Sequence, residues 1–264
     1  MPVTIVGLLS DFGLEDHYVA AMKAEVLRRA PDAVLVDITH LVPPQQIARG
    51  AYELACVLPS FPNGSIIVAV VDPGVGSERR PLALRLSSGH RLIGPDNGLL
   101  GRAALEDGAS LVDGRLRLGS GQAGYVLDPT RIASRLSATF HGRDLFAPAA
   151  GLLAAGTPLE GLGAPTSEIE ALPVLEGDRV LAVDRFGNVI TSVRPEPGTD
   201  YEVIVGGQRI VGLRRTYSDA QGLLLLTSSS GYLEIAVPGS SAAALLGLAP
   251  GDRVTVVRRE ARHD

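Results

Sequence analysis

The architecture of this chain follows from the run Ile66-Ile-Val-Ala-Val-Val-Asp72-Pro-Gly-Val-Gly76. Its first six residues are apolar and mostly β-branched and end at a turn, which is typical of a strand buried on both faces of a parallel sheet. Similar runs at residues 3–9 and 33–38 precede it, and apolar residues recur at helical spacing in residues 15–29 and 45–58. This order of strand, helix, strand, helix, strand predicts a three-layer α/β domain with a mostly parallel sheet and right-handed crossovers.

A second domain is predicted in the last third of the chain. The segment Gly161-Leu-Gly-Ala-Pro-Thr-Ser is rich in turn formers, which places the boundary near residues 165–175 and gives domains 1–168 and 169–264. Beyond it, short β-prone runs are separated by Gly, Pro, Asn and Asp, without long helical periodicity. These runs predict a small β-barrel-like domain, and they cover residues 179–184, 189–193, 201–205, 223–227, 232–237 and 253–258.

The composition excludes several classes of partner. With 24 basic and 29 acidic side chains the net charge is −5, which offers no positive field for nucleic acid or anionic lipid. The absence of tryptophan and an aromatic content of 4% disfavour stacking platforms for single-stranded nucleic acid. A single cysteine excludes a thiolate metal cluster, and His17 and His40 lack the spacing of a metal site, so we expect no metal. A small substrate, cationic if charged, is the favoured partner.

The sequence carries no sign of export or of membrane insertion. No apolar run approaches the roughly 18 residues of a membrane-spanning helix. The start Met1-Pro-Val-Thr-Ile lacks the basic region of a signal peptide, and no cleavage site follows it. We therefore expect a cytoplasmic protein without a membrane partner.

Acidic residues follow the predicted strands at the points where the strands end. Asp11 follows the first strand, Asp37 ends the second, and Asp72 follows the third. Asp96 comes after a short strand pair whose turn, Ser87-Ser-Gly-His90, contains a glycine suited to a hairpin. Because ligands of open α/β sheets collect at the carboxyl ends of the strands, we expect a binding site along this edge.

Three residues could activate a water molecule together. Asp72 precedes a Pro-Gly-Val-Gly turn that leaves room for a ligand, Arg79 follows on the same loop, and His141 begins the last predicted helix of the domain. A carboxylate, a guanidinium and an imidazole can hold a water, orient it and accept its proton. Asp-Pro-Gly is also a common turn and arginine a common surface residue, so the spacing alone leaves both interpretations open.

Two further groups of polar residues have both a structural and a ligand-binding interpretation. Asp11 could cap a turn and Asp16 could lie in the first turn of a helix. A strand-end carboxylate could instead accept hydrogen bonds from both hydroxyls of a ribose. Asp184 and Asn188 could form a hairpin turn around Phe-Gly, or the asparagine could bind the donor and acceptor edge of an adenine.

Six motifs occur in order along the chain. They are Leu9-Ser-Asp-Phe-Gly, Val36-Asp-Ile-Thr-His, Val70-Val-Asp-Pro-Gly-Val-Gly-Ser-Glu-Arg-Arg, Gly94-Pro-Asp-Asn-Gly-Leu-Leu, Phe140-His-Gly-Arg-Asp-Leu-Phe and Asp184-Arg-Phe-Gly-Asn. Together they resemble the SAM hydroxide adenosyltransferases, also called S-adenosylmethionine hydrolases, which are relatives of the fluorinating and chlorinating enzymes. The resemblance covers nearly the whole chain. It implies an α/β domain followed by a β-barrel-like domain, assembled as a homotrimer with active sites between neighbouring subunits.

The resemblance also implies roles for individual residues. The family's water-activating residues correspond to Asp72, Arg79 and His141, and its ribose-binding carboxylate corresponds to Asp11. The other implied substrate-binding residues are Asp16, His17, Tyr18 and Asp184 toward the methionine end, Asn188, Ser229, Val237 and Gly239 toward the adenine, and Glu234. Ser230 departs from the halogenating relatives, in which an arginine at this position helps to hold methionine.

Water is the nucleophile that these positions favour. In the fluorinating relatives, tyrosine, threonine and tyrosine stand at the positions of Asp72, Arg79 and His141. Their halide pocket consists of small hydroxyl and backbone donors, whereas the residues of this chain are ionisable. The resemblance therefore implies hydrolysis of S-adenosyl-L-methionine to adenosine and L-methionine by water at the 5′ carbon. The substrate carries the adenosyl group itself, so we expect no separate cofactor.

Three alternatives remain open. An adenosine-binding or nucleoside-sensing module would use the same contacts with little turnover, and a halide-using adenosyl transferase would share the substrate. A metal-dependent phosphoester hydrolase would use the strand-end aspartates. Release of adenosine and methionine over many turnovers would exclude the first, and unchanged activity in a chelator would exclude the last.

Overall fold

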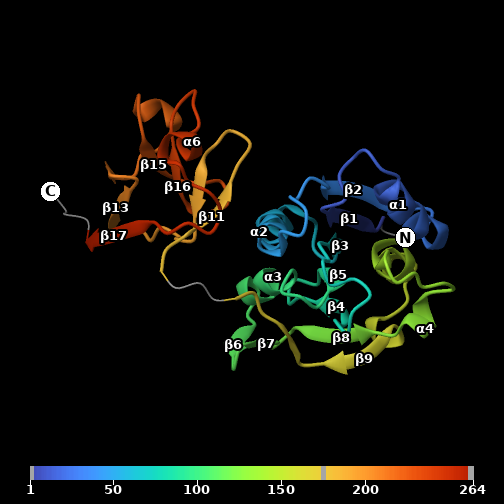
Figure 1. The fold of residues 1–264 in the computed structure, drawn as a ribbon. Coiled ribbons are helices and arrows are strands. Elements are labelled where there is room, and N and C mark those ends of the chain that lie inside the picture. The colour runs from blue at the N-terminus through green and yellow to red at the C-terminus, as the bar shows by residue number, and fades with distance from the viewer. Residues whose placement is uncertain (1–2, 174–176, 261–264) are drawn as a thin grey trace. The chain divides into compact units, whose positions relative to one another are not determined.

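The computed structural model describes residues 3–173 and 177–260, and the chain divides into two compact units (Figure 1). The N-terminal unit comprises Met1–Pro173 and the C-terminal unit Val174–Asp264. The first is a mixed α/β domain and the second is mostly β.

A seven-stranded sheet forms the middle of the N-terminal unit, in the order β2-β1-β3-β5-β4-β8-β9. Among the described residues, its half from β2 to β5 is parallel, and the pairs β5–β4, β4–β8 and β8–β9 are antiparallel. The expectation of a mostly parallel sheet is therefore wrong for half of the pairings. The strands are β1 (Ile5–Ser10), β2 (Val34–Thr39), β3 (Ile66–Val70), β4 (Pro81–Arg85), β5 (Arg91–Pro95), β8 (Ala123–Leu127) and β9 (Gly163–Thr166).

The change of direction arises at the hairpin between β4 and β5. The Leu86 N–H donates to the His90 carbonyl at 2.9 Å, and Gly89 adopts a φ of +84°, which glycine accommodates without steric cost. A connection this short can join only antiparallel neighbours, because a parallel pair needs a crossover of a dozen or more residues. The predicted turn is confirmed. The prediction of a mostly parallel sheet came from the alternation of strands and helices and did not take into account that this turn reverses the strand direction.

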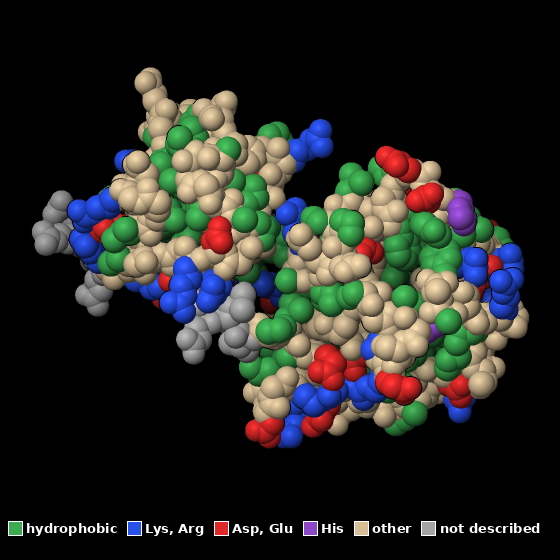
Figure 2. Space-filling model, viewed as in Figure 1, with side chains coloured by type: hydrophobic (Ala, Val, Ile, Leu, Met, Phe, Trp, Pro, Cys, Tyr) green, Lys and Arg blue, Asp and Glu red, His purple; other side chains and the backbone are tan. Residues whose placement is uncertain are grey.

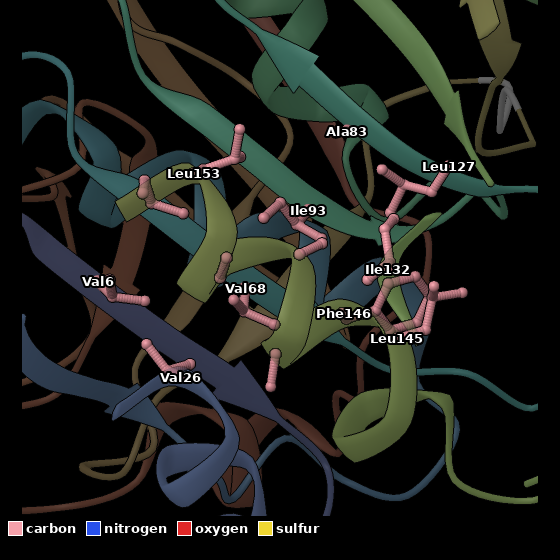
Figure 3. Packing of buried hydrophobic residues seen from close by; sticks show 14 of the residues in the cluster. Val6, Val26, Val68, Ala83, Ile93, Leu127, Ile132, Leu145, Phe146 and Leu153 are labelled. Carbon is pink, nitrogen blue, oxygen red and sulfur yellow. The ribbon is translucent and has the colours of Figure 1, made fainter. Parts of the chain in front are cut away.

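Helices cover both faces of the sheet, as the three-layer prediction requires. One buried cluster joins β1 and β3 to α1 (Tyr18–Arg29) and α5 (Ala147–Ala154), and Figure 3 labels Val6, Val26, Val68 and Leu153 as one member from each of these elements. A second cluster on the opposite face contains α2 (Ile47–Val57) and α3 (Gly101–Glu106). Successive residues of β3 point to opposite faces of the sheet, so Val68 belongs to the first cluster and Ile67 to the second.

Residues 99–140 and 163–170 contribute elements that periodicity did not predict. A small antiparallel sheet consists of β6 (Ser110–Val112), β7 (Arg115–Arg117) and β10 (Glu168–Glu170). Within residues 99–140 lies the short helix α4 (Pro129–Ile132), and elsewhere the unit contains the short helices η1 (Leu58–Ser60) and η3 (Leu159–Gly161). Such three- and four-residue elements lack the length over which a hydrophobic period can be recognised.

The C-terminal unit contains two antiparallel sheets around one apolar cluster. One has the order β11-β12-β16-β15, with β11 (Val180–Val183), β12 (Val189–Thr191), β16 (Leu233–Ala236) and β15 (Leu224–Thr227). The other has the order β14-β13-β17, with β14 (Gln208–Val211), β13 (Thr199–Val205) and β17 (Thr255–Glu260). All six predicted strands are present. The structure adds three elements that were not predicted, which are β14, η4 (Tyr217–Asp219) and α6 (Ala242–Leu246). Closure into a barrel stays a prediction.

Burial at α3 gives a direct test of this packing. Leu100 is 1% exposed within the second cluster, whereas Leu105, five residues later, is 43% exposed. We expect Leu100→Ala to lower the free energy of unfolding by about 2–5 kcal/mol, because it leaves a cavity, and Leu105→Ala to lower it by less than about 1 kcal/mol. Urea denaturation measures both, and equal losses in the two variants would contradict the packing.

Candidate active site

Asp72, Arg79 and His141 form one hydrogen-bonded group. The Nε of Arg79 donates to the Asp72 carboxylate at 3.0 Å, and a terminal nitrogen of the same guanidinium donates at 2.5 Å. That terminal nitrogen also lies 2.7 Å from Nδ1 of His141. The Asp72 and Arg79 side chains are only 5% and 9% exposed, so water screens their charges weakly. Arg79 thus connects a strand-end loop to a helix start 62 residues later.

The loop after β3 is shaped to deliver Arg79 to this position. Two successive turns, Val75 N–H to the Asp72 carbonyl and Ser77 N–H to the Gly74 carbonyl, fold it back on itself. Gly76 has a φ of +79°, and a Cβ there would lie 2.5 Å from the carbonyl oxygen of Ala138. Only glycine therefore permits the backbone contact that brings the loop against the segment leading to His141.

His141 stands at the start of a π-helical segment, Gly142–Phe146, that continues into α5. The carboxylate of Asp144 accepts a hydrogen bond from the Ser137 backbone N–H at 2.8 Å, which fastens the approach to this helix. The ring of Phe146, from the same segment, lies 5.2 Å below the Arg79 guanidinium. One irregular turn thus contributes the imidazole and an aromatic support for the arginine.

The surroundings of His141 keep its imidazole neutral. Burial lowers the pKa of His141 most, and the positive charge of Arg79 lowers it further, against the opposing effect of Asp72 and Asp144. Arginine can only donate, so Nδ1 of His141 is the acceptor in the Arg79 contact. The single proton of the neutral ring then resides on Nε2.

A cavity of about 410 Å³ adjoins this group in the N-terminal unit. Among the described residues, Asp72 is the member of the group that lines it, together with Asp11 and Tyr18, which the sequence also singled out. The remaining lining residues are Phe12, Pro44, Gln45, Pro73 and Val75. The rings of Phe12 and Tyr18 pack against each other at 6.0 Å, so one wall of the cavity is aromatic.

Asp11 is fixed by a strained neighbour. The backbone N–H of Gln45 donates to Oδ2 of Asp11 at 2.8 Å, and Gln45 adopts a φ of +64°, which is uncommon for a residue other than glycine. Strain of this kind is concentrated at ligand sites, where the surrounding structure holds it in place. The second oxygen, Oδ1, is the one that a ligand hydroxyl could approach.

The other predicted residues of this unit lie beside the cavity lining and not in it. Asp16 is exposed and precedes α1, so the alternative that placed it in the first helical turn is wrong. His17 is the N-cap residue of α1, makes no side-chain capping bond, and packs against Tyr18 with ring centroids 4.8 Å apart.

A second cavity, of about 650 Å³, lies in the C-terminal unit. It is lined by three residues that the sequence singled out, Asn188, Val237 and Gly239. Phe186 and Tyr217 line it as well, and both are unusually exposed for aromatic residues, at 77% and 49%. An apolar cavity with aromatic rims and a few polar groups is the usual form of a site for a flat, aromatic ligand.

Asp184 and Glu234 support this cavity from behind. The Asp184 carboxylate accepts hydrogen bonds from the backbone N–H groups of Phe186 and Asn188 and from the Asn188 side-chain amide, each at 2.9 Å. Glu234 is buried and accepts from the Tyr217 hydroxyl at 2.7 Å, which raises the pKa of Tyr217 to about 12. Ser229 lies in the exposed turn between β15 and β16, outside the cavity lining.

Phe186, Tyr217 and Gln45 are among the lining residues that were not predicted. Phe186 lies inside the Asp184-Arg-Phe-Gly-Asn188 motif, and its exposure is the only property that separates it from a core aromatic. Tyr217 begins η4, whose capping box pairs Thr216 with Asp219, a spacing of the Ser/Thr-x-x-Asp/Glu type that the sequence displays. Gln45 could not have been found, because nothing in its residue type indicates a positive φ.

The chain is similar to known proteins along nearly its whole length. Models of the SAM hydroxide adenosyltransferase N-terminal and C-terminal domains match residues 6–163 and 178–255. A Thermus thermophilus protein named (R)-S-adenosyl-L-methionine hydrolase is 42% identical, over 93% of this chain and 96% of its own. This chain belongs to the SAM hydroxide adenosyltransferase family. The solved structure of an uncharacterized conserved protein from Thermotoga maritima, 30% identical, superposes with a TM-score of 0.84 over 96% of this chain and 100% of its own.

The family also has halogenating relatives, which are more distant from this chain. A fluorinase of Nocardia brasiliensis is 26% identical over 96% of both chains. Proteins named as hydrolases and as fluorinases are thus both similar to this chain over nearly its whole length.

Two other strand-end carboxylates of this family member, Asp37 and Asp96, are each paired with a cation. Asp37 accepts a bond from Lys23 at 2.6 Å, and Asp96 accepts from Arg80. Within residues 3–173 and 177–260, no group of three His, Cys, Asp or Glu side chains is arranged to hold a metal ion. The aspartates therefore do not form the open acidic cluster that a metal-dependent phosphoesterase would need.

Acidic and basic side chains are intermixed on the face of the N-terminal unit that Figure 2 draws. Lys and Arg side chains lie beside Asp and Glu side chains there, so their fields largely cancel. None of the helices in the described part of the chain combines the length and the hydrophobicity of a membrane span.

The contact between Arg79 and His141 predicts a measurable titration. In Arg79→Gln the positive charge is lost while Asp72 and Asp144 remain, so we expect the pKa of His141 to rise. Titration of the imidazole protons by NMR measures this change, with the signal assigned from a His141→Ala variant. Arg80→Gln, which removes an arginine that pairs with Asp96 instead, is the control and should leave that titration unchanged. A His141 pKa that does not respond to the loss of Arg79 would refute the contact.

Proposed function

We propose that this chain hydrolyses S-adenosyl-L-methionine to adenosine and L-methionine and that it acts on the (R) epimer at sulfur. The observation that carries the proposal is the group of Asp72, Arg79 and His141, placed so that Asp72 shares a cavity with Asp11. The name of the 42% identical relative supports both the substrate and its epimer.

The proposed reaction requires few catalytic groups. Oxygen of a water molecule forms a bond to the 5′ carbon while the bond from that carbon to sulfur breaks. The electron pair of that bond stays on sulfur, so the sulfonium becomes the neutral thioether of methionine and needs no proton. One water proton remains on the new 5′-hydroxyl and the other passes to the protein and then to solvent. The enzyme therefore needs an aligned water and a proton acceptor, and it needs no general acid.

Asp72 is the acceptor in this mechanism. Nδ1 of His141 already accepts from Arg79, and its Nε2 carries the ring proton, so neutral His141 has no free lone pair for the water. The Asp72 carboxylate has about four lone-pair directions, which are more than its contacts with Arg79 use. Arg79 in turn stabilises the hydroxide character that develops on the water.

The C-terminal cavity is proposed to hold the adenine. The Asn188 side-chain nitrogen donates to Asp184, so its carbonyl oxygen is left to accept a hydrogen bond from the exocyclic amine of the base. Phe186 and Tyr217 offer ring faces on which a purine can stack. Asp11 receives the ribose hydroxyls, and Asp16, His17, Tyr18, Ser229 and Glu234 remain proposed contacts or supports of the remaining substrate groups.

Halide transfer is the less favourable alternative for this chain. A halide ion would have to lose its water next to the Asp72 carboxylate, which is 5% exposed and would repel it. Water is neutral and accepts and donates hydrogen bonds, so the same groups attract it. This contrast also explains how fluorinases with 26% identity can keep the fold and change the nucleophile.

Isotopically labelled water tests the proposed reaction. Incubation of each sulfonium epimer in H₂¹⁸O should place the label in the 5′-hydroxyl of adenosine, with faster turnover of the (R) epimer. Asp72→Asn should lower kcat by about a hundredfold to ten-thousandfold while the Kd of adenosine, measured by calorimetry, stays unchanged.

Asn188→Ala is the matched binding control for that experiment. It should raise the Kd of adenosine by about tenfold, because a base contact is lost. Adenosine without label would exclude attack by water at carbon. An equal loss of adenosine affinity in Asp72→Asn would show that the carboxylate binds and does not catalyse.

We further propose that the chain assembles as a homotrimer whose active sites include residues of neighbouring subunits. The edge strand β2 leaves Val34 and Val36 exposed at 47% and 38%, which contradicts the prediction that it is buried on both faces. Leu14 and Leu41, in the loops after β1 and β2, are 67% and 64% exposed. Apolar residues gathered on an edge strand and beside a cavity are typical of a surface that another copy covers.

Sedimentation equilibrium tests the assembly. The wild-type protein should have the mass of three 27.5 kDa chains, and Val36→Glu should shift it toward the single chain by placing a charge on the apolar edge. Leu245→Glu, at a residue 64% exposed in the C-terminal unit, is the control and should leave the mass unchanged. A single-chain mass for the wild type would refute the trimer.

A further inference from the structure

A buried polar chain lies directly behind the loop that carries Asp11. The hydroxyl of Ser10 is 2.7 Å from Nδ1 of His40, and Nε2 of His40 is 3.1 Å from Oδ1 of Asp37. Lys23 of α1 closes the chain with a bond to the other oxygen of Asp37 at 2.6 Å. Ser10 is 0% and His40 2% exposed, so the bond between them is shielded from water, whereas the Asp37 side chain is 45% exposed.

The donors and acceptors of the chain follow from residue chemistry. A carboxylate only accepts, so Nε2 of His40 donates to Asp37, and in the neutral ring Nδ1 accepts from the Ser10 hydroxyl. The Ser10 oxygen accepts in turn from the backbone N–H of Phe12 at 3.3 Å. Each polar atom of the chain thus has a partner, which a buried network requires.

The pairing of β1 with β2 brings His40 opposite Ser10. Leu8 pairs with Asp37 but Leu9 pairs with Thr39, so Ile38 is an extra residue that shifts the register by one position. Bulges of this type occur beside sites, where they redirect a side chain. In this register His40 contacts the loop of Asp11 in two ways. Its side chain bonds to Ser10, and its carbonyl accepts a hydrogen bond from the backbone N–H of Gly13 at 2.8 Å.

We infer that the Ser10–His40–Asp37 chain positions the Asp11 carboxylate for the ribose hydroxyls. The residues that flank Asp11 are held from both sides, Phe12 through the Ser10 hydroxyl and Gly13 through the His40 carbonyl. Gln45 fixes one oxygen of Asp11 from a third direction. This inference rests on the proposed function only in assigning the ribose to Asp11.

The residue types invite a different interpretation, as a nucleophilic serine triad. Two observations exclude that role. Ser10 is fully buried, so no substrate carbon can reach it, and its hydroxyl proton and lone pair serve His40 and Phe12. In addition, His40 faces Ser10 through Nδ1 and the carboxylate through Nε2, which ties two strand ends together. The chain is therefore a brace for Asp11, and its residues are positioning residues.

Two substitutions of His40 separate its two hydrogen bonds, the one with Ser10 and the one with Asp37. In His40→Asn the shorter amide oxygen can still accept from Ser10 but no longer reaches Asp37. In His40→Gln the longer amide can donate to Asp37 but leaves the Ser10 hydroxyl without its acceptor. Ser10→Ala removes the same hydrogen bond between Ser10 and His40 by deleting the hydroxyl.

The readout is the discrimination between adenosine and 2′,3′-dideoxyadenosine, measured as two Kd values by calorimetry. We expect Ser10→Ala and His40→Gln to raise the Kd of adenosine by about tenfold, because the hydrogen bond between the ribose and the charged Asp11 carboxylate is misplaced. Binding of the dideoxy compound, which has no ribose hydroxyl for Asp11, should change by less than about twofold. His40→Asn should keep most of the wild-type discrimination. With S-adenosylmethionine the KM should rise in the same variants while kcat stays nearly constant, because the Asp72 group is untouched.

His90→Asn is the control, since His90 is another buried histidine and lies in the β4–β5 turn. It should leave the ratio of the two Kd values unchanged. Equal weakening of both nucleosides in Ser10→Ala and His40→Gln would overturn the inference and reduce the chain to a support of the fold. Equal binding of both nucleosides by the wild type would overturn it by removing the ribose from Asp11. Failure of the wild type to form adenosine from S-adenosylmethionine would refute the proposed function, and the Kd ratio would still decide the positioning role.

Discussion

The contact of one guanidinium with both a carboxylate and an imidazole is the constraint around which the N-terminal unit is arranged. Arg79 neutralises Asp72 in a nearly dry environment and at the same time fixes the tautomer of His141. The contact joins residues 62 positions apart, so it forms only when the loop after β3 and the start of the π-helical segment lie against each other. Gly76 permits the close approach to Ala138 that this contact needs, and the ring of Phe146 supports the guanidinium.

Charge pairing governs the rest of the strand edge in the same way. Carboxylates collect where parallel strands end, and each would be costly to bury alone. Asp37 is paired with Lys23 and His40, and its pKa is lowered because these bonds outweigh the effect of burial. Asp96 accepts a hydrogen bond from Arg80 through one carboxylate oxygen and from the Glu170 N–H through the other. The edge is thus assembled from local ion pairs, and only the pair with Arg79 adjoins the cavity of Asp11.

Sequence patterns predicted the parts of this protein whose physics is local or periodic. The runs of Val and Ile specified β1, β2 and β3, and the six strands of the C-terminal unit followed from their turn residues. The antiparallel half of the sheet was missed because direction depends on the length of the β4–β5 connection and on β8 and β9, which have no strong period. The family's motifs were needed to group Asp72, Arg79 and His141, since no local pattern relates residue 79 to residue 141. The three side chains are in hydrogen-bonding contact, and their catalytic role stays a prediction. Tyr217 and Gln45 depend on backbone geometry, which residue types do not encode.

Turn formation and the proposed ligand binding are compatible in the residues for which the sequence left both open. Asp184 accepts the backbone bonds of a tight turn and, with its second oxygen, orients the Asn188 amide toward the cavity. Asp11 accepts the Gln45 N–H and keeps one oxygen for the cavity. In both cases the turn supplies the hydrogen bonds that hold a polar group in one orientation before any ligand arrives, so less ordering remains to be done on binding. A structural interpretation of a strand-end residue is therefore no argument against a functional one, because the rigidity that the turn provides is what a binding group needs.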